Sequence, residues 1–203
     1  LWSRGLGDVY KRQGYRLFGE NKVQDALAKS ELMDANHPGL EWSIIGGLQT
    51  NKAKYVARFA TEFQALDSLK IAHELDKRLQ KEGRQLRVLV QVNSSAEPQK
   101  SGIAPEEAVD FARELAAFDS LDVRGLMTVA LNSSDQRAVA DCFDLVVATQ
   151  EKLRQEAGDT SDWSELSMGM SGDLEIAIAH GSTQVRIGTD IFGTRDPVRT
   201  WRP

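Results

Sequence analysis

Hydroxyl groups and glycines gather in one stretch of the sequence, ELSMGMSGDLEIAIAHGSTQVRIGTDIFGTR, which spans residues 165–195. Ser171 stands before a segment with helical spacing that Gly181 closes, so its hydroxyl is placed to cap that helix. The free N–H groups at a helix start can hold a phosphate. Gly188 and Thr189 follow the run QVRI, and their small side chains leave their backbone N–H groups accessible to a ligand. The pattern predicts a phosphate site, although turns and caps alone would explain the same residues.

Arg186 is the second residue that indicates chemistry. It lies among apolar neighbours in VRIG, within a segment that is typical of a buried strand. A buried guanidinium needs a partner. Two interpretations stay open: an internal ion pair with one of the many acids, or a permanently charged donor that faces a ligand.

Three asparagines follow expected strands. Asn21 comes after the strand that ends in FGE, Asn51 lies in IIGGLQTNK, and Asn93 ends VLVQVN. In a parallel barrel, polar residues at the carboxyl ends of strands point into the mouth of the site. Helix capping also explains each asparagine singly.

The usual catalytic motifs are missing from the sequence. The three histidines, His37, His73 and His180, show no metal-ligand spacing, so we expect no metal site. Cys142 lies in the apolar context of a buried helix and is expected to be inert. No GxSxG occurs, and the lack of GxxxxGK[ST] argues against a nucleoside triphosphate.

Strand-like runs alternate with stretches of helical spacing, which predicts an α/β fold with a parallel sheet. The expected helices lie in residues 68–83, 105–118 and 134–158. The expected strands are Tyr15–Phe18, Trp42–Ile45, Phe63–Leu66, Arg87–Val92, Val123–Val129, Leu166–Met168 and Val185–Phe192. A closed (β/α)8 barrel needs an eighth strand, and an open doubly wound sheet does not, so the pattern leaves both possible.

Composition sets broad limits on function. The chain has 203 residues, enough for one domain with a full core, and its net charge of −5 argues against a general nucleic-acid binder. The single cysteine allows no internal disulfide and indicates a reducing compartment. We see neither a membrane span nor a signal peptide and expect a cytoplasmic protein.

Five motifs, in this order, carry a resemblance to a known family: FGENKVQ, WSIIGGLQTNK, VLVQVNSSAEPQKSG, GLMTVA and LSMGMSGDLEIAIAHGSTQVRIGTDIFG. Together they resemble the pyridoxal-phosphate homeostasis proteins, from about Gly14 to Arg195. The resemblance implies a (β/α)8 TIM-type barrel of the kind found in the alanine racemase N-terminal domain. It also implies binding of pyridoxal 5′-phosphate without an established catalytic activity.

The resemblance further implies roles for individual residues. Arg186 corresponds to the residue that faces the pyridine nitrogen, where a permanent donor weakens the ring as an electron sink. Gly188 and Thr189 correspond to backbone donors to the phosphate, and Ser171, with Ser167 near it, to a hydroxyl donor. Ser182 and Thr183 of GST are expected to support the same phosphate loop, and Asn21 and Asn51 to lie near the cofactor.

The sequence departs from the family pattern mainly at its start. The family carries its Schiff-base lysine on a first strand, in a stretch like AVSKTKP, where this chain has LWSRGLGDVYKRQ. We therefore expect residues 1–13 to be a non-native or disordered leader and 14–203 to be one cofactor-binding barrel domain without its first strand. Binding is then expected to be non-covalent, with Lys22 and Lys52 as weak substitutes. Smaller departures are Ser43, Ile44 and Gly47, where the family usually has a histidine, an aromatic residue and a proline.

Two other functions stay open. One is the barrel domain of a pyridoxal-phosphate-dependent amino-acid racemase or decarboxylase. Such enzymes need a second domain, for which we expect no room after the family motif. The other is a binding module for another phosphorylated ligand, since a phosphate cup serves any phosphomonoester. We expect a monomer that binds a small cofactor and neither nucleic acid nor membranes.

Overall fold

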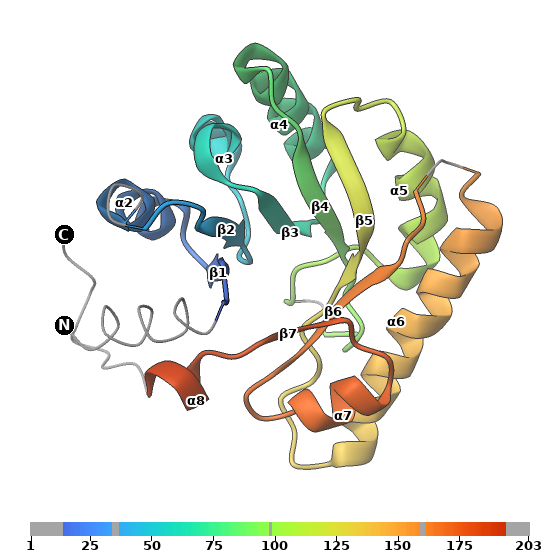
Figure 1. Ribbon diagram of the computed structural model, residues 1–203. Helices are drawn as coiled ribbons and strands as arrows, with labels where there is room; N and C mark the ends of the chain where they lie inside the picture. Colours follow the sequence, from blue (N-terminus) through green and yellow to red (C-terminus); the bar gives the residue numbers. More distant parts are fainter. Residues whose placement is uncertain (1–13, 34–36, 98, 159–160, 194–203) are drawn as a thin grey trace.

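A computed structural model describes residues 14–33, 37–97, 99–158 and 161–193. The described strands form one parallel sheet in which each strand pairs with the next one along the chain (Figure 1). They are β1 (Leu17–Glu20), β2 (Glu41–Ile44), β3 (Glu62–Leu66), β4 (Leu86–Gln91), β5 (Leu121–Met127), β6 (Glu165–Met170) and β7 (Gln184–Arg186). The expected leader, residues 1–13, lies outside the described residues.

Helices connect the strands and lie around the outside of the sheet (Figure 1). They are α2 (Val23–Met33), η1 (Thr50–Lys52), α3 (Ala53–Phe59), α4 (Leu69–Glu82), η2 (Pro105–Glu107), α5 (Ala108–Leu115), α6 (Gln136–Glu156), α7 (Leu174–Ala179) and α8 (Thr189–Phe192). None of the described helices combines the length and the apolar character that a membrane span requires.

The sheet curls into a nearly closed barrel, so strands that are distant in the sequence face each other across its interior. Ser167 of β6 donates a hydrogen bond to Gln64 of β3 at 2.8 Å, and Gln184 of β7 reaches Glu62 of β3 at 3.5 Å. A doubly wound sheet would carry helices on both faces. The predicted (β/α) barrel is therefore confirmed, with β1 and β7 as the edges of the described sheet.

Apolar side chains pack between the strands and the surrounding helices. Helix α4 shows why the sequence folds this way: Leu75 and Leu79 are fully buried, and Gly83 ends the helix with φ of +63°. This left-handed conformation suits glycine, as the sequence pattern predicts. Helix α6 begins after Asp135, whose carboxylate accepts the N–H groups of Arg137 and Ala138.

One predicted strand is wrong in its second half. The run Val185–Phe192 reads as continuous strand, but β7 ends at Arg186 and α8 follows two residues later. The physical reason is the partner: Arg186 pairs with Met170, which is the last residue of β6. Beyond that point no β6 residue remains to accept a ladder hydrogen bond, so the chain turns into a short helix instead.

Candidate functional site

The carboxyl ends of β6 and β7 bring four predicted site residues to one rim of the barrel. Ser171 follows β6 directly, Arg186 ends β7, and Gly188 and Thr189 open α8. The hydroxyl of Ser171 accepts a hydrogen bond from the N–H of Asp190 at 3.4 Å, which joins the two loops. Gly188 is exposed, and a Cβ added there would meet no atom within 4 Å. This rim therefore has open space beside backbone N–H groups.

Arg186 lies largely buried behind this rim. One terminal nitrogen, Nη1, donates to the carbonyl oxygen of Ser167 at 2.8 Å and to its hydroxyl at 2.6 Å, and Nη2 donates to the carbonyl oxygen of Thr128 at 2.7 Å. No carboxylate of the described residues forms an ion pair with it, although Asp173 exerts a weaker attraction from further away. The ion-pair interpretation of Arg186 thus receives no support from the described contacts.

Burial lowers the pKa of Arg186 to about 10. The guanidinium therefore keeps its charge at neutral pH, but its solvation is replaced only by neutral oxygen atoms. A guanidinium carries five N–H donors, and the contacts to Ser167 and Thr128 use three of them. The other two N–H groups have no hydrogen-bond partner among the described contacts.

Ser167 lies deeper than its predicted place beside Ser171. Its side chain is fully buried on β6, where the hydroxyl donates to Oε1 of Gln64 and accepts from Arg186. Its role in this arrangement is to hold the guanidinium, since the described contacts turn its hydroxyl into the barrel.

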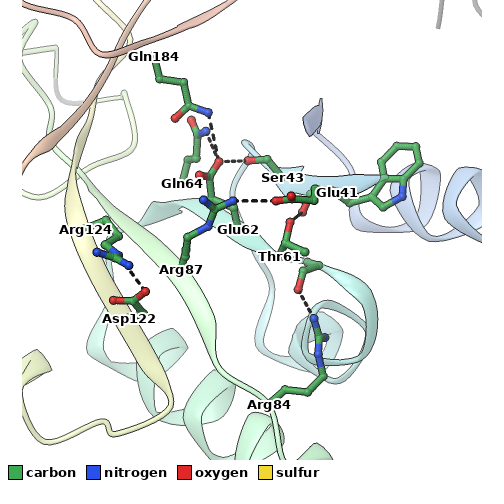
Figure 2. A network of polar contacts seen from close by, with 12 residues as sticks. Glu41, Ser43, Thr61, Glu62, Gln64, Arg84, Arg87, Asp122, Arg124 and Gln184 are labelled. Atoms are coloured by element: carbon green, nitrogen blue, oxygen red, sulfur yellow. Dashed lines mark hydrogen bonds and ion pairs between the residues drawn. The ribbon is translucent and has the colours of Figure 1, made fainter. Parts of the chain in front are cut away.

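From Ser167, hydrogen bonds between polar side chains continue across the barrel interior. Gln64 donates from Nε2 to Oε1 of Glu62 at 2.5 Å, and the same oxygen accepts from Ser43 at 2.6 Å. Figure 2 shows Ser43, Gln64 and Gln184 directed at Glu62 from three strands. Sequence reasoning missed Glu62 and Gln64. Their signal is present in the printed sequence, because two polar residues two positions apart in the apolar strand EFQAL share one face.

Ser182 and Thr183 lie at the other end of the strands. Both precede β7, and both bind Leu166 near the start of β6: the N–H of Leu166 donates to Oγ1 of Thr183 at 2.8 Å. The hydroxyl of Ser182 lies 2.8 Å from the carbonyl oxygen of Met168. These contacts fasten the amino ends of β6 and β7. The expected support of the phosphate loop by Ser182 and Thr183 stays a prediction.

The expected cap of α7 is also different. The helix starts at Leu174 after Asp173, and the Asp173 carboxylate accepts the N–H of Met170 at 2.6 Å. The prediction that Ser171 caps this helix is therefore wrong, and its hydroxyl meets the start of α8 instead. Gly169 permits the close packing here, because its φ is +89° and an added Cβ would lie 2.6 Å from Cβ of Ala177.

The three asparagines take different places on the same rim. Asn21 is exposed after β1, and its carbonyl oxygen packs against Gly46, so that the loops after β1 and β2 touch. Asn51 is exposed within η1. Asn93 organises its own loop, because its side-chain amide donates to the carbonyl oxygen of Glu97 at 2.9 Å. No contact among the described residues joins these asparagines to Arg186.

A cavity of about 620 Å³ lies between α4, η2 and α5, and neither Arg186 nor the loops after β6 and β7 line it. Its lining is rich in carboxylates, among them Asp67, Glu106 and Asp110. Burial raises the pKa of Asp67, against the hydrogen bond from the N–H of Gly102. An acidic lining repels a phosphate, so the phosphate site predicted from the sequence does not lie here.

A family model described as the alanine racemase N-terminal domain matches residues 4–196. The pyridoxal phosphate homeostasis protein of Pasteurella multocida is 40% identical over 196 residues, which cover 96% of this chain and 84% of that protein. The protein of the same name from Escherichia coli K12 is 42% identical over 187 residues, which cover 90% of this chain and 77% of that protein.

Solved structures agree with these matches. PipY of Synechococcus elongatus, solved with pyridoxal phosphate bound, has a TM-score of 0.84 at 31% identity and covers 93% of this chain and 87% of its own. The form without pyridoxal phosphate has a TM-score of 0.87 at 32% identity, with the same coverage. Alanine racemase of Clostridium difficile shares the fold alone, with a TM-score of 0.75 at 16% identity over 98% of this chain and 50% of that enzyme.

Proposed function

The chain belongs to the alanine racemase N-terminal domain family and, within it, to the pyridoxal phosphate homeostasis proteins, and from this premise we propose that it binds pyridoxal 5′-phosphate and serves the homeostasis of that cofactor. The names of the relatives and the bound cofactor in PipY support this proposal. The observation in this chain that carries it is the largely buried, charged Arg186, whose described partners are all neutral.

The residues present fit the cofactor. Arg186 offers the remaining guanidinium donors to the ring nitrogen, and the backbone N–H groups of Gly188 and Thr189 offer donors to the phosphate. Ser171 contributes a hydroxyl from the neighbouring loop, and Ser167 keeps Arg186 in place. We propose that Asn21 and Asn51 flank the cofactor from the loops after β1 and β2.

Bound pyridoxal phosphate would supply an electron sink for amino-acid chemistry. A guanidinium at the ring nitrogen donates a hydrogen bond and supplies no readily transferable proton, since Arg186 holds its own proton to about pH 10. The protein's part in this arrangement is to keep the ring in its less reactive, unprotonated state. This supports a binding protein without catalytic activity of its own.

We propose that binding is non-covalent. Among the described lysines that follow the carboxyl ends of strands, Lys22 is exposed, and Lys52 lies 5.9 Å from the ring centre of Tyr55. Neither has a described contact with Ser171 or Arg186. We further propose a cytoplasmic monomer, which agrees with the single free and buried Cys142.

An absorbance titration of the purified protein with pyridoxal phosphate tests the proposal. We expect saturable binding of one cofactor per chain that reverses on gel filtration. Pyridoxal, which lacks the phosphate, should compete poorly, and simple sugar phosphates should not displace the cofactor. Displacement by sugar phosphates would instead favour a general phosphate module, and turnover of alanine enantiomers would favour a racemase.

A further inference from the structure

Four side chains form one continuous hydrogen-bonded chain through the barrel interior. Arg186 donates to the hydroxyl of Ser167, Ser167 donates to Oε1 of Gln64, and Gln64 donates from Nε2 to Oε1 of Glu62. The three successive distances are 2.6, 2.8 and 2.5 Å. Glu62 and Gln64 are each 1% exposed and Ser167 is 0% exposed, so water has little access to replace a link.

The two ends of this chain have opposite and fixed hydrogen-bonding characters. A guanidinium has donors and no acceptor, whereas an ionised carboxylate has acceptors and no donor. Glu62 is used as an acceptor in all of its described contacts, which include Ser43 and Gln184. With both ends fixed, the amide of Gln64 and the hydroxyl of Ser167 each have one orientation that satisfies the whole chain.

We propose that Glu62 is a positioning residue for Arg186, because it sets the direction of the hydrogen bonds that hold the guanidinium towards the ligand. The proposal rests on the proposed function for the identity of the ligand. Glu62 lies at the amino end of the barrel on β3, whereas Arg186 ends β7, so the effect is exerted through Gln64 and Ser167.

Other charged groups near Glu62 do not take over this role. Arg87, its neighbour in the β3–β4 register, forms an ion pair with Glu41 at 3.0 Å. Glu165 of β6 faces the same region, where burial and then the charge of Glu62 raise the pKa of Glu165. Neither residue takes part in the described links between Glu62 and Arg186, so Glu165 provides a matched control.

Substitutions at Glu62 and Gln64 distinguish an effect of hydrogen-bond direction from an effect of side-chain size. Glu62→Gln keeps the size but adds donors, so position 62 no longer fixes the orientation of the Gln64 amide, and only the Arg186 end still favours one direction of the chain. The double variant Glu62→Gln with Gln64→Glu moves the acceptor-only group two residues along β3, next to Ser167, and restores the direction. Gln64→Glu alone places two carboxylates side by side and should harm the site most.

The first measurement uses the ligand-free protein. Labelling with ¹⁵N and comparison with Arg186→Lys identify the guanidinium N–H signals of Arg186, whose exchange with water is then timed. We expect Glu62→Gln to accelerate this exchange about tenfold, as for loss of a hydrogen bond to a charged group. The double variant should return to the parent rate, and Glu165→Gln should not change it.

The second measurement is the Kd for pyridoxal phosphate in the same proteins. We expect Glu62→Gln to raise Kd about tenfold, with recovery in the double variant. Ser167→Ala cuts the chain at another link, and its combination with Glu62→Gln should bind no worse than Ser167→Ala alone. If a Glu62 variant does not fold, this Ser167 variant still reports on the exchange of Arg186.

An unchanged exchange rate in Glu62→Gln would overturn the proposal, as would a double variant that recovers neither exchange nor affinity. Altered exchange without any binding of pyridoxal phosphate would leave the positioning role intact and reject the proposed function instead. The two failures are therefore distinguishable.

Discussion

Arg186 is a charged residue whose partial burial costs free energy in the ligand-free protein. Its charge is taken out of water, which lowers its pKa to about 10, and the oxygen atoms of Ser167 and Thr128 replace only part of the lost solvation. A ligand with a hydrogen-bond acceptor at the carboxyl ends of β6 and β7 would complete that replacement. Under the proposed function, that free-energy cost would be offset when the ligand binds.

Substitution of Arg186 tests its part in binding. We expect Arg186→Ala to raise the Kd for pyridoxal phosphate roughly 30- to 100-fold, because a hydrogen bond from a charged group is lost. Arg186→Lys keeps the charge but not the planar fork that binds Ser167 and Thr128, and should cost about tenfold. Titration by absorbance measures both values.

Arg84 is a matched control, because it also clamps two backbone carbonyl oxygens, those of Ala57 at 2.6 Å and Ala60 at 2.7 Å. Arg84→Ala should lower the melting temperature without changing Kd. An equal loss of affinity in both variants would show that the effect of Arg186 is structural only.

Glu165 gives a prediction for pH. Burial, followed by the charge of Glu62, raises the pKa of Glu165 above its ordinary value of 4.5. The folded state then favours the protonated form, so this stabilising contribution is present in acid and is lost as pH rises through the raised pKa. Glu165→Gln should raise the melting temperature at pH 7, and the gain should shrink as pH falls below about 4.5.

The exposed Glu114 serves as the control for this experiment. Glu114→Gln should change the melting temperature little at either pH. A gain from Glu165→Gln that is the same in acid as at neutral pH would contradict the assignment to burial of charge.

At the scale of elements, the junction between β6 and α7 determines where Ser171 lies. We expect Gly169→Ala to destabilise the protein by about 1–3 kcal/mol, because the residue has φ of +89° and the new methyl would press on Ala177. The displaced loop should also weaken binding of pyridoxal phosphate. Thermal melting and titration of the same sample measure the two effects.

Gly172→Ala is the comparison within the same loop, since a Cβ there meets no atom within 4 Å and φ lies outside the left-handed region. It should leave both stability and affinity close to those of the parent. Equal damage from the two substitutions would mean that loop flexibility, rather than the packing of Gly169, is what matters.

The secondary-structure elements and the site could be predicted from the sequence to different extents. Helix α4 was predictable because its spacing and Gly83 are local signals, and Arg186 stood out as a charge in an apolar strand. The end of β7 could not be predicted from local sequence, because it depends on where β6 ends. Gln64 was missed for a similar reason: its partner Ser167 lies 103 positions away, and only the closed barrel brings them together.

At the scale of the whole molecule, the residues that stabilise the fold and the residues proposed for binding lie in different layers. The apolar layer lies between strands and helices, whereas the polar chain that ends at Arg186 lies inside the barrel. A defect in the outer layer should therefore lower the stability of the protein without a direct effect on the site.

Phe143, fully buried on α6, provides the test. Phe143→Ala should lower the free energy of unfolding by about 3–5 kcal/mol, from lost burial and the cavity left behind. The Kd for pyridoxal phosphate, measured well below the melting temperature, should stay within twofold of the parent value. A large rise in Kd in the folded variant would contradict the separation of layers.

The sequential pairing of the strands also determines at what point of its synthesis the protein could first bind the proposed cofactor. Each strand pairs with its predecessor, so the sheet can grow from β1 onward as the chain leaves the ribosome. Arg186, however, ends β7, the last of the described strands, and the Ser167–Gln64 hydrogen bond forms only after β6 has been synthesised. A nascent chain would therefore hold most of the described sheet before the proposed site is complete, and a bound cofactor would stabilise only chains that have been synthesised beyond β7.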